Sequence, residues 1–118
     1  MSIERLDSGP RLSRAVIHGN TIYLAGQVAP DTSDQSVAGQ TAQILSGIDA
    51  LLARAGTSKH KLLSVTVWMT DLSRFAEMNK VWEAWIEPGC APARATAEVK
   101  LATPGYLVEM TAIAALGD

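Results

Sequence analysis

The side chains with the clearest chemical potential are an arginine and a glutamate in the last quarter of the sequence, Arg94 and Glu109. A guanidinium group presents a planar set of N–H donors that suits two-point capture of a carboxylate. Glu109 is the one acidic residue in the otherwise apolar run from Tyr106 to Leu116. Apolar surroundings raise the pKa of a carboxyl group, which suits it to proton transfer near neutral pH. The pair permits a site for a small carboxylic acid, while a solvent-facing Glu109 on a half-exposed strand is an equally open interpretation.

The residues around this pair have the pattern of two strands and a turn. Polar and apolar residues alternate from Ala93 to Leu101, which is the period of a strand with two distinct faces. Residues 103–105 have the composition of a turn. We therefore expect a final hairpin, with Arg94 on its first strand and Glu109 on its second.

Apolar spacing predicts four more strands and two helices before this hairpin. The strands are expected at residues 2–6, 13–17, 21–25 and 62–70, with a tight turn at 18–20. Three- and four-residue spacing predicts one helix from Val37 to Arg54, begun by Ser36 and stopped by Gly56, and a second from about residue 71 to 86. Trp82 and Trp85 lie on the apolar stripe of the second helix, so we interpret them as core and not as a binding platform.

The order β-β-β-α-β-α-β-β predicts an α+β fold, in which two helices pack on one face of a mixed sheet. The other face of that sheet needs cover, because its strands carry apolar residues that one chain leaves unpaired. A second copy of the chain is the natural cover, so we expect an oligomer. No repeat and no second domain is evident, and residues 1–118 are interpreted as a single domain.

Composition narrows the class of protein. The chain has 118 residues, of which 47% are hydrophobic and 19% charged, and its net charge is −2. This balance predicts a globular domain and disfavours nucleic acid as an obligate partner. The single cysteine, Cys90, cannot form an internal disulfide, and no signal-like or membrane-spanning apolar run is evident. We therefore expect a cytoplasmic protein without a membrane partner.

Other chemistries lack support in the sequence. His18, His60 and Cys90 have no metal-ligand spacing, so we expect no metal site. Cys90 has no evident base beside it and is interpreted as an incidental thiol. Gly26 follows the third strand and indicates a close backbone approach or a bulge, and an ordinary strand end is at least as well supported. Asn79 on the second helix is a candidate hydrogen-bonding residue for the site.

Several segments together resemble the Rid (reactive intermediate deaminase, YjgF-type) family, most of all its YoaB-type branch, over nearly the whole chain. The segments that carry the resemblance are Leu24–Gln27, Val67–Leu72, Phe75–Asn79, Trp82–Trp85, Ala91–Arg94, Val108–Glu109 and Ala112–Ala114. The resemblance implies a chorismate-mutase-like fold and a homotrimer with sites in clefts between subunits. It also implies hydrolysis of enamines and small 2-imino acids, such as 2-iminobutanoate, to 2-oxo acids and ammonia, with no metal or organic cofactor.

The resemblance also implies roles for particular residues. Arg94 matches the family's arginine for the substrate carboxylate, and Glu109 matches the glutamate that orients or activates the attacking water. Asn79 and Gly26 match positions that line the pocket. Thr96 replaces a pocket cysteine of the best-studied members.

The N-terminal loop departs from the family pattern as well. A loop tyrosine of the best-studied members is replaced here by Leu12 or a neighbour, with Arg11 and Arg14 close by. Either arginine could bind a second acidic group or be a solvated surface charge, and we favour the solvated interpretation. These departures from the family pattern can change the range of substrates and the activity itself.

The alternative function is a non-catalytic trimer that binds a small carboxylate. An RNA-cleaving role is disfavoured by the acidic balance of the chain.

Overall fold

The computed structural model describes residues 1–117 as six strands and two α-helices. The strands are β1 (Ile3–Leu6), β2 (Ala15–His18), β3 (Thr21–Leu24), β4 (Leu62–Met69), β5 (Ala93–Glu98) and β6 (Val108–Ala115). The helices are α1 (Val37–Arg54) and α2 (Phe75–Trp85), and short 3-10 turns lie at Lys59–Lys61 and Leu72–Arg74. The predicted element order and the bounds of α1 are confirmed.

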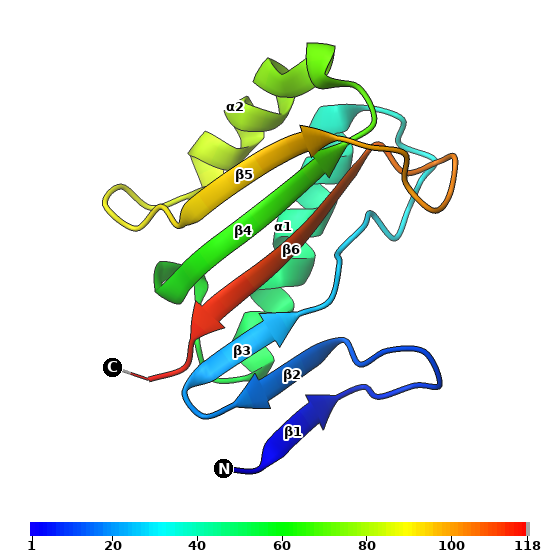
Figure 1. Cartoon of the computed structure of the whole chain (residues 1–118). Helices are drawn as coiled ribbons and strands as arrows, with labels where there is room; N and C mark the ends of the chain where they lie inside the picture. Colours follow the sequence, from blue (N-terminus) through cyan, green and yellow to red (C-terminus); the bar gives the residue numbers. More distant parts are fainter. Residues whose placement is uncertain (118) are drawn as a thin grey trace.

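The six strands form one sheet in the order β1-β2-β3-β6-β4-β5, with both helices on the same face (Figure 1). All neighbouring strands are antiparallel except β4 and β5, which are parallel. The α+β fold with two helices on one face of a mixed sheet is therefore confirmed. No helix in the described part of the chain has both the length and the apolar character needed to cross a membrane.

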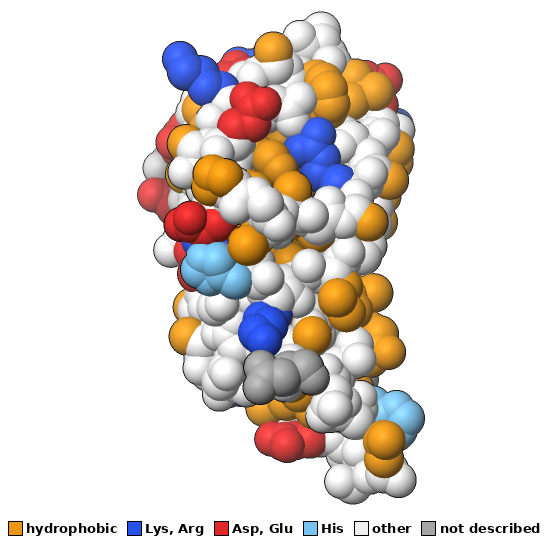
Figure 2. Space-filling view, turned by 90° about the vertical axis from the view of Figure 1, so that its left-hand side faces the viewer, with side chains coloured by type: hydrophobic (Ala, Val, Ile, Leu, Met, Phe, Trp, Pro, Cys, Tyr) orange, Lys and Arg blue, Asp and Glu red, His pale blue; other side chains and the backbone are white. Residues whose placement is uncertain are grey.

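The expected final hairpin is wrong. β4 lies between β5 and β6, so the strands that carry Arg94 and Glu109 are not neighbours. The reason is α2, which connects β4 to β5 as a crossover and thereby returns the chain parallel to β4. β5 is thus an edge strand of the sheet. Figure 2 views the molecule from the left-hand side of Figure 1 and shows Lys and Arg side chains lying singly on that side, not as a basic patch.

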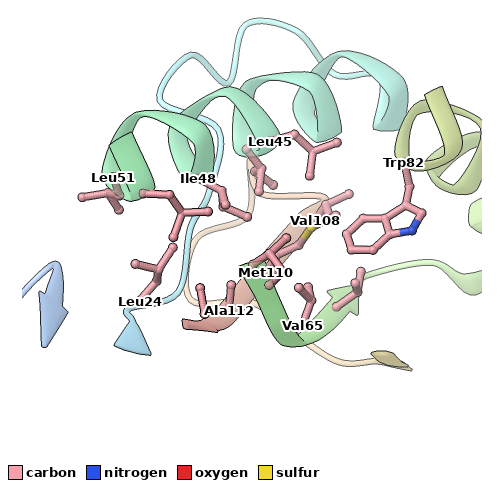
Figure 3. Close-up of a cluster of buried hydrophobic side chains, with 14 of the residues drawn as sticks. Leu24, Leu45, Ile48, Leu51, Val65, Trp82, Val108, Met110 and Ala112 are labelled. Atoms are coloured by element: carbon pink, nitrogen blue, oxygen red, sulfur yellow. The ribbon is translucent and has the colours of Figure 1, made fainter. Parts of the chain in front are cut away.

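The core fills the space between the helices and the sheet (Figure 3). Ile44, Ile48 and Leu51 follow the predicted stripe of α1 and are at most 2% exposed. Ser36 caps α1 by accepting a hydrogen bond from the Gly39 backbone N–H. Gly56 ends it with φ of +80°, a conformation that glycine adopts without a steric penalty.

The opposite face of the sheet has no helix over it. β5 shows this most clearly, because Ala93, Ala95 and Ala97 are exposed on that face. Tyr23 on β3, which lies in register with Ile113 of β6, is 45% exposed there. We call this surface the open face; it consists of the outward residues of β2, β3, β6, β4 and β5. Because apolar side chains are exposed on the open face, we still expect another chain to cover it.

A buried glutamine fixes the loop that leads into β6. Gln40 on α1 is fully buried, and its side chain forms three hydrogen bonds to the backbone. Its amide donates to the carbonyls of Asp34 (3.0 Å) and Gly105 (2.9 Å), and its oxygen accepts from Leu107 N–H (2.9 Å). Gln40 thereby fixes the position of the start of β6, which carries Glu109, relative to α1.

Gln40→Ala is expected to lower the free energy of unfolding by about 2–4 kcal/mol, because it leaves buried backbone groups without partners. Urea denaturation followed by circular dichroism measures this. Gln43→Ala on the same helix is the matched control, since its bonds to Asp31 are solvent-exposed. Equal losses in the two variants would show that Gln40 has no special structural role.

Candidate functional site

Arg94 lies beneath α2 at the edge of the sheet. In the β4–β5 register it is paired with Val65, and Thr96 is paired with Val67. Both valines are buried against the helices, so Arg94 and Thr96 also face the helices. The guanidinium carbon of Arg94 lies 5.0 Å from the ring centre of Trp82 and 5.7 Å from that of Phe75. These distances place the cation within range of both aromatic faces.

The Arg94 site has unused hydrogen-bonding capacity. Arg94 Nη1 and Thr96 Oγ1 are both buried and have no hydrogen-bond partner among the described residues. Burial lowers the pKa of the Arg94 guanidinium, and the nearby Glu83 carboxylate raises it in part. Arginine nevertheless stays charged at neutral pH. A buried charge and a buried hydroxyl without partners are costly, so the pair is typical of a site that awaits an anionic ligand.

Two further features adjoin this cation. A hollow of about 280 Å³ is lined by Leu72, Phe75 and Thr96. Asn79 lies on α2 four residues after Phe75 and three before Trp82, so helical periodicity places it on the same stripe as the two rings. This periodicity places Asn79 on the side of α2 that faces Arg94.

Glu109 lies on the open face, where Gly26 makes room for it. An ideal Cβ built on Gly26 would overlap Oε2 of Glu109 and lie 3.0 Å from its Cδ. The backbone here is bulged: Tyr23 pairs with Ile113, but the next pairing is Gln27 with Met110, which gives β3 one extra residue. The predicted bulge at Gly26 is confirmed, and the group that closely approaches the glycine is the Glu109 carboxylate.

The Glu109 carboxyl group is half-buried. It has no hydrogen bond or ion pair to any residue in the range 1–117, and Trp68 of β4 lies directly across from it. Burial raises the pKa of this carboxyl group above its usual value. The group is therefore suited to exchange a proton at a pH closer to neutrality than an ordinary glutamate.

The raised pKa has a consequence for stability. Below a pH of about 4.5 the group is protonated in both folded and unfolded chains, and above that value the unfolded chain loses its proton first. Glu109 therefore costs stability as the pH rises. Glu109→Gln is expected to raise the melting temperature at pH 7 and above, and to have no effect near pH 4. Scanning calorimetry at equal chain concentration tests this, and a difference independent of pH would contradict it.

Three comparisons with known proteins place the chain in a family. Residues 2–116 match a family described as Endoribonuclease L-PSP. The "RutC family protein YoaB" of Escherichia coli is 41% identical over 116 residues, which are 98% of this chain and 100% of that protein. The chain belongs to the Rid family, also called YjgF or RutC.

Solved structures of the Rid family agree. A member of the YjgF protein family from Neisseria meningitidis is 38% identical, with a TM-score of 0.96 over 100% of this chain and 98% of that one. A "putative translation initiation inhibitor" from Salmonella typhimurium is 39% identical, with a TM-score of 0.88 over 97% of both chains.

Within one Rid chain, Arg94 and Glu109 do not meet. Arg94 shares its face with the buried Val65, whereas Glu109 shares the open face with Trp68. The two side chains that suggested one site therefore point to opposite sides of the sheet. Gly26 lies with Glu109, and Thr96 and Asn79 lie with Arg94, so the candidate residues form two half-sites.

Sequence reasoning missed the aromatic walls of the Arg94 half-site. Trp82 is 6% exposed and belongs to the core as predicted, but one of its faces also contacts the guanidinium. Phe75, 38% exposed, also lies against the guanidinium. The seven-residue spacing of Phe75 and Trp82 on α2 was the available signal, because it places both rings on one stripe. Trp85 packs against the core and donates its Nε1–H to Asp49.

Proposed function

We propose that this Rid-family protein hydrolyses small 2-imino acids, and their enamine tautomers, to 2-oxo acids and ammonia. The observation that carries the proposal is the buried, unpartnered Arg94 Nη1 with Thr96 Oγ1 beside it, together with the isolated, half-buried Glu109. The first half-site offers donors to a carboxylate. The second offers a proton acceptor of raised pKa, held where Gly26 leaves space.

Arg94 binds the substrate carboxylate in this proposal. The carboxylate would accept hydrogen bonds from Arg94 Nη1 and the Thr96 hydroxyl, which satisfies both orphaned groups. Phe75 and Trp82 lie within cation–π range of the guanidinium and help to hold it in position for the acid. Asn79 is placed to add a hydrogen bond from α2.

Glu109 moves the protons. Water attacks the imine carbon while its proton passes to the Glu109 carboxylate, and the tetrahedral carbinolamine forms. Glu109 then returns that proton to the nitrogen, the C–N bond breaks, and ammonia leaves while the carbinolamine hydroxyl gives its proton to Glu109 and the carbonyl forms. The substrate imine is electrophilic once it is protonated, so the reaction needs no metal or organic cofactor.

The complete site is formed between two copies of the chain. Arg94 lies at the free edge of β5 and Glu109 on the open face, so no rotation of side chains within one chain unites them. A neighbouring copy whose open face approaches the β5 edge would supply Glu109 to the Arg94 of the first. A closed homotrimer satisfies this contact at each of its interfaces and covers the exposed alanines of β5.

The experiment that tests the function is ammonia release from freshly formed 2-imino acids. Amino-acid oxidases generate the imines in place from several amino acids, and the spontaneous rate is subtracted. Acceleration by the wild-type protein is the expected result, and the preferred amino acid reports the shape of the pocket. A folded, oligomeric protein that accelerates no imine would contradict the proposal.

A non-catalytic carboxylate-binding module is the second candidate. The Arg94–Thr96 half-site favours it, because binding requires only the donors and not Glu109. Calorimetry with 2-oxo acids would then detect binding that Arg94→Ala removes, in a protein without deaminase activity.

An RNA-cleaving role, which the description of the matching family suggests, has less support. The chain carries a net charge of −2, and the side of the molecule shown in Figure 2 has no basic cluster. Failure to bind single-stranded RNA at low salt would exclude this role.

A further inference from the structure

A second arginine lies on the same face of the sheet as Glu109. Arg14 directly precedes β2, whose first residue, Ala15, is fully buried against the helices; if the alternation of the strand continues back by one residue, Arg14 faces the open face. The backbone of Arg14 is fixed on both sides. Its N–H donates to the Leu6 carbonyl (2.9 Å), and its carbonyl accepts from Ala25 N–H (2.9 Å).

This pairing brings Arg14 close to the Glu109 carboxylate. Ala25, to which Arg14 is bonded, is followed by Gly26, and Glu109 Oε2 lies directly over Gly26. One strand spacing and one residue step separate the Arg14 and Gly26 backbones, or about 6 Å in the plane of the sheet. An extended arginine side chain spans a comparable distance, so its guanidinium can reach a molecule bound at Glu109.

The charge of Arg14 is available for a ligand. Its side chain is exposed and has no hydrogen bond or ion pair to any of residues 1–117. Asp7, an acid whose pKa is affected by Arg14, is held instead by Arg54 through bonds of 2.7 and 3.1 Å. The pKa of Asp7 is lowered chiefly by Arg54, and Arg14 contributes less. Arg14 is thus an exposed cation whose backbone is fixed near Gly26, over which the Glu109 carboxylate lies.

We propose that Arg14 binds a side-chain carboxylate of the substrate, so that this protein prefers dicarboxylic 2-imino acids. This inference rests on the proposed function. The first carboxylate binds Arg94 of one copy, and the imine carbon lies at Glu109 of the next copy. A second carboxylate, one or two carbons beyond the imine carbon, then faces Arg14 of the copy that supplies Glu109. The substrates of this class are the imines formed by oxidation of aspartate and glutamate.

The experiment compares kcat/KM for imines generated from aspartate and glutamate with those for imines from alanine and 2-aminobutyrate. Wild type is expected to favour the dicarboxylic imines, and Arg14→Gln to lower the dicarboxylic-to-monocarboxylic ratio about tenfold, the effect of one charge-assisted hydrogen bond. Arg11→Gln is the matched control, because Arg11 is exposed on the same loop but outside the strand pairing. Its ratio should equal that of wild type.

The outcomes separate this inference from the proposed function. A ratio that is the same in wild type and Arg14→Gln, or that falls only in Arg11→Gln, overturns the role of Arg14 while hydrolysis itself stands. If wild type hydrolyses no imine, the proposed function fails, and calorimetry decides the ligand class. The inference is supported if wild type binds 2-oxoglutarate more tightly than 2-oxobutanoate and Arg14→Gln abolishes this difference. Equal affinity for the two acids, or no binding of either, overturns it.

Discussion

Arg94→Ala is expected to lower kcat/KM for 2-imino acid hydrolysis by about 10²–10³-fold, while the oligomer stays intact. Truncating one partner of a buried, hydrogen-bonded charge pair costs about 3–4 kcal/mol, which corresponds to that factor. The loss should be found with every imine, since all share the first carboxylate. Ammonia release measures the rate, and light scattering measures the oligomer.

Two companion variants make the Arg94 test specific. Lys80→Ala removes an exposed cation from α2 and should leave the rate as in wild type. Arg94→Met keeps an aliphatic stem between Phe75 and Trp82 but removes the unpartnered Nη1. It should therefore raise the free energy of unfolding by about 1 kcal/mol while abolishing activity, because a binding group without its ligand destabilises the free protein. Wild-type turnover in Arg94→Ala would refute the assigned role.

Glu109→Gln is expected to lower kcat by about 10²–10⁴-fold, which is the usual contribution of a positioned acid–base group. The amide keeps the size of the side chain but neither accepts nor returns a proton. KM should change much less than kcat, since Glu109 acts on the water and the leaving nitrogen and not on the substrate carboxylate. Steady-state kinetics with the preferred imine separates the two parameters.

Gly26→Ala serves as the positional control for Glu109. It retains the carboxylate but places a Cβ where Oε2 lies, so the group must move. Activity should fall in this variant as well, although the acid is chemically intact. If Glu109→Gln retains full activity, Glu109 has no part in proton transfer.

Local patterns determined much of the fold in advance. The three- and four-residue spacing of Ile44, Ile48 and Leu51 specified α1, and Ser36 and Gly56 specified its ends. These signals lie within a few residues of the structure they determine. A single sequence is therefore enough to predict the helix and its ends.

Strand neighbours were beyond the reach of local pattern. The turn at residues 103–105 suggested that β5 and β6 pair, but β4 lies between them because α2 forces a parallel return. A shift of one strand in the order alters which side chains share a face. Arg94 and Glu109 were correctly selected by residue type, yet their placement on opposite faces depends on registers with Val65 and Trp68 that no local pattern encodes.

The glycine at position 26 is an intermediate case. Its place after a strand indicated a bulge or a close approach, and both are present. The identity of the approaching group was not predictable, because Glu109 reaches Gly26 from a strand more than eighty positions along the chain. Long-range pairing of β3 with β6 supplies that contact.

The central claim is that Arg94 of one copy and Glu109 of another form one imine-hydrolysing site. The most direct test is ammonia release by mixed oligomers of Arg94→Ala and Glu109→Gln chains, co-expressed with different tags and purified through both. Each mixed trimer would contain one intact site of three, so we predict about a third of wild-type activity from two inactive variants. Mixed oligomers no more active than either variant alone would contradict the shared site.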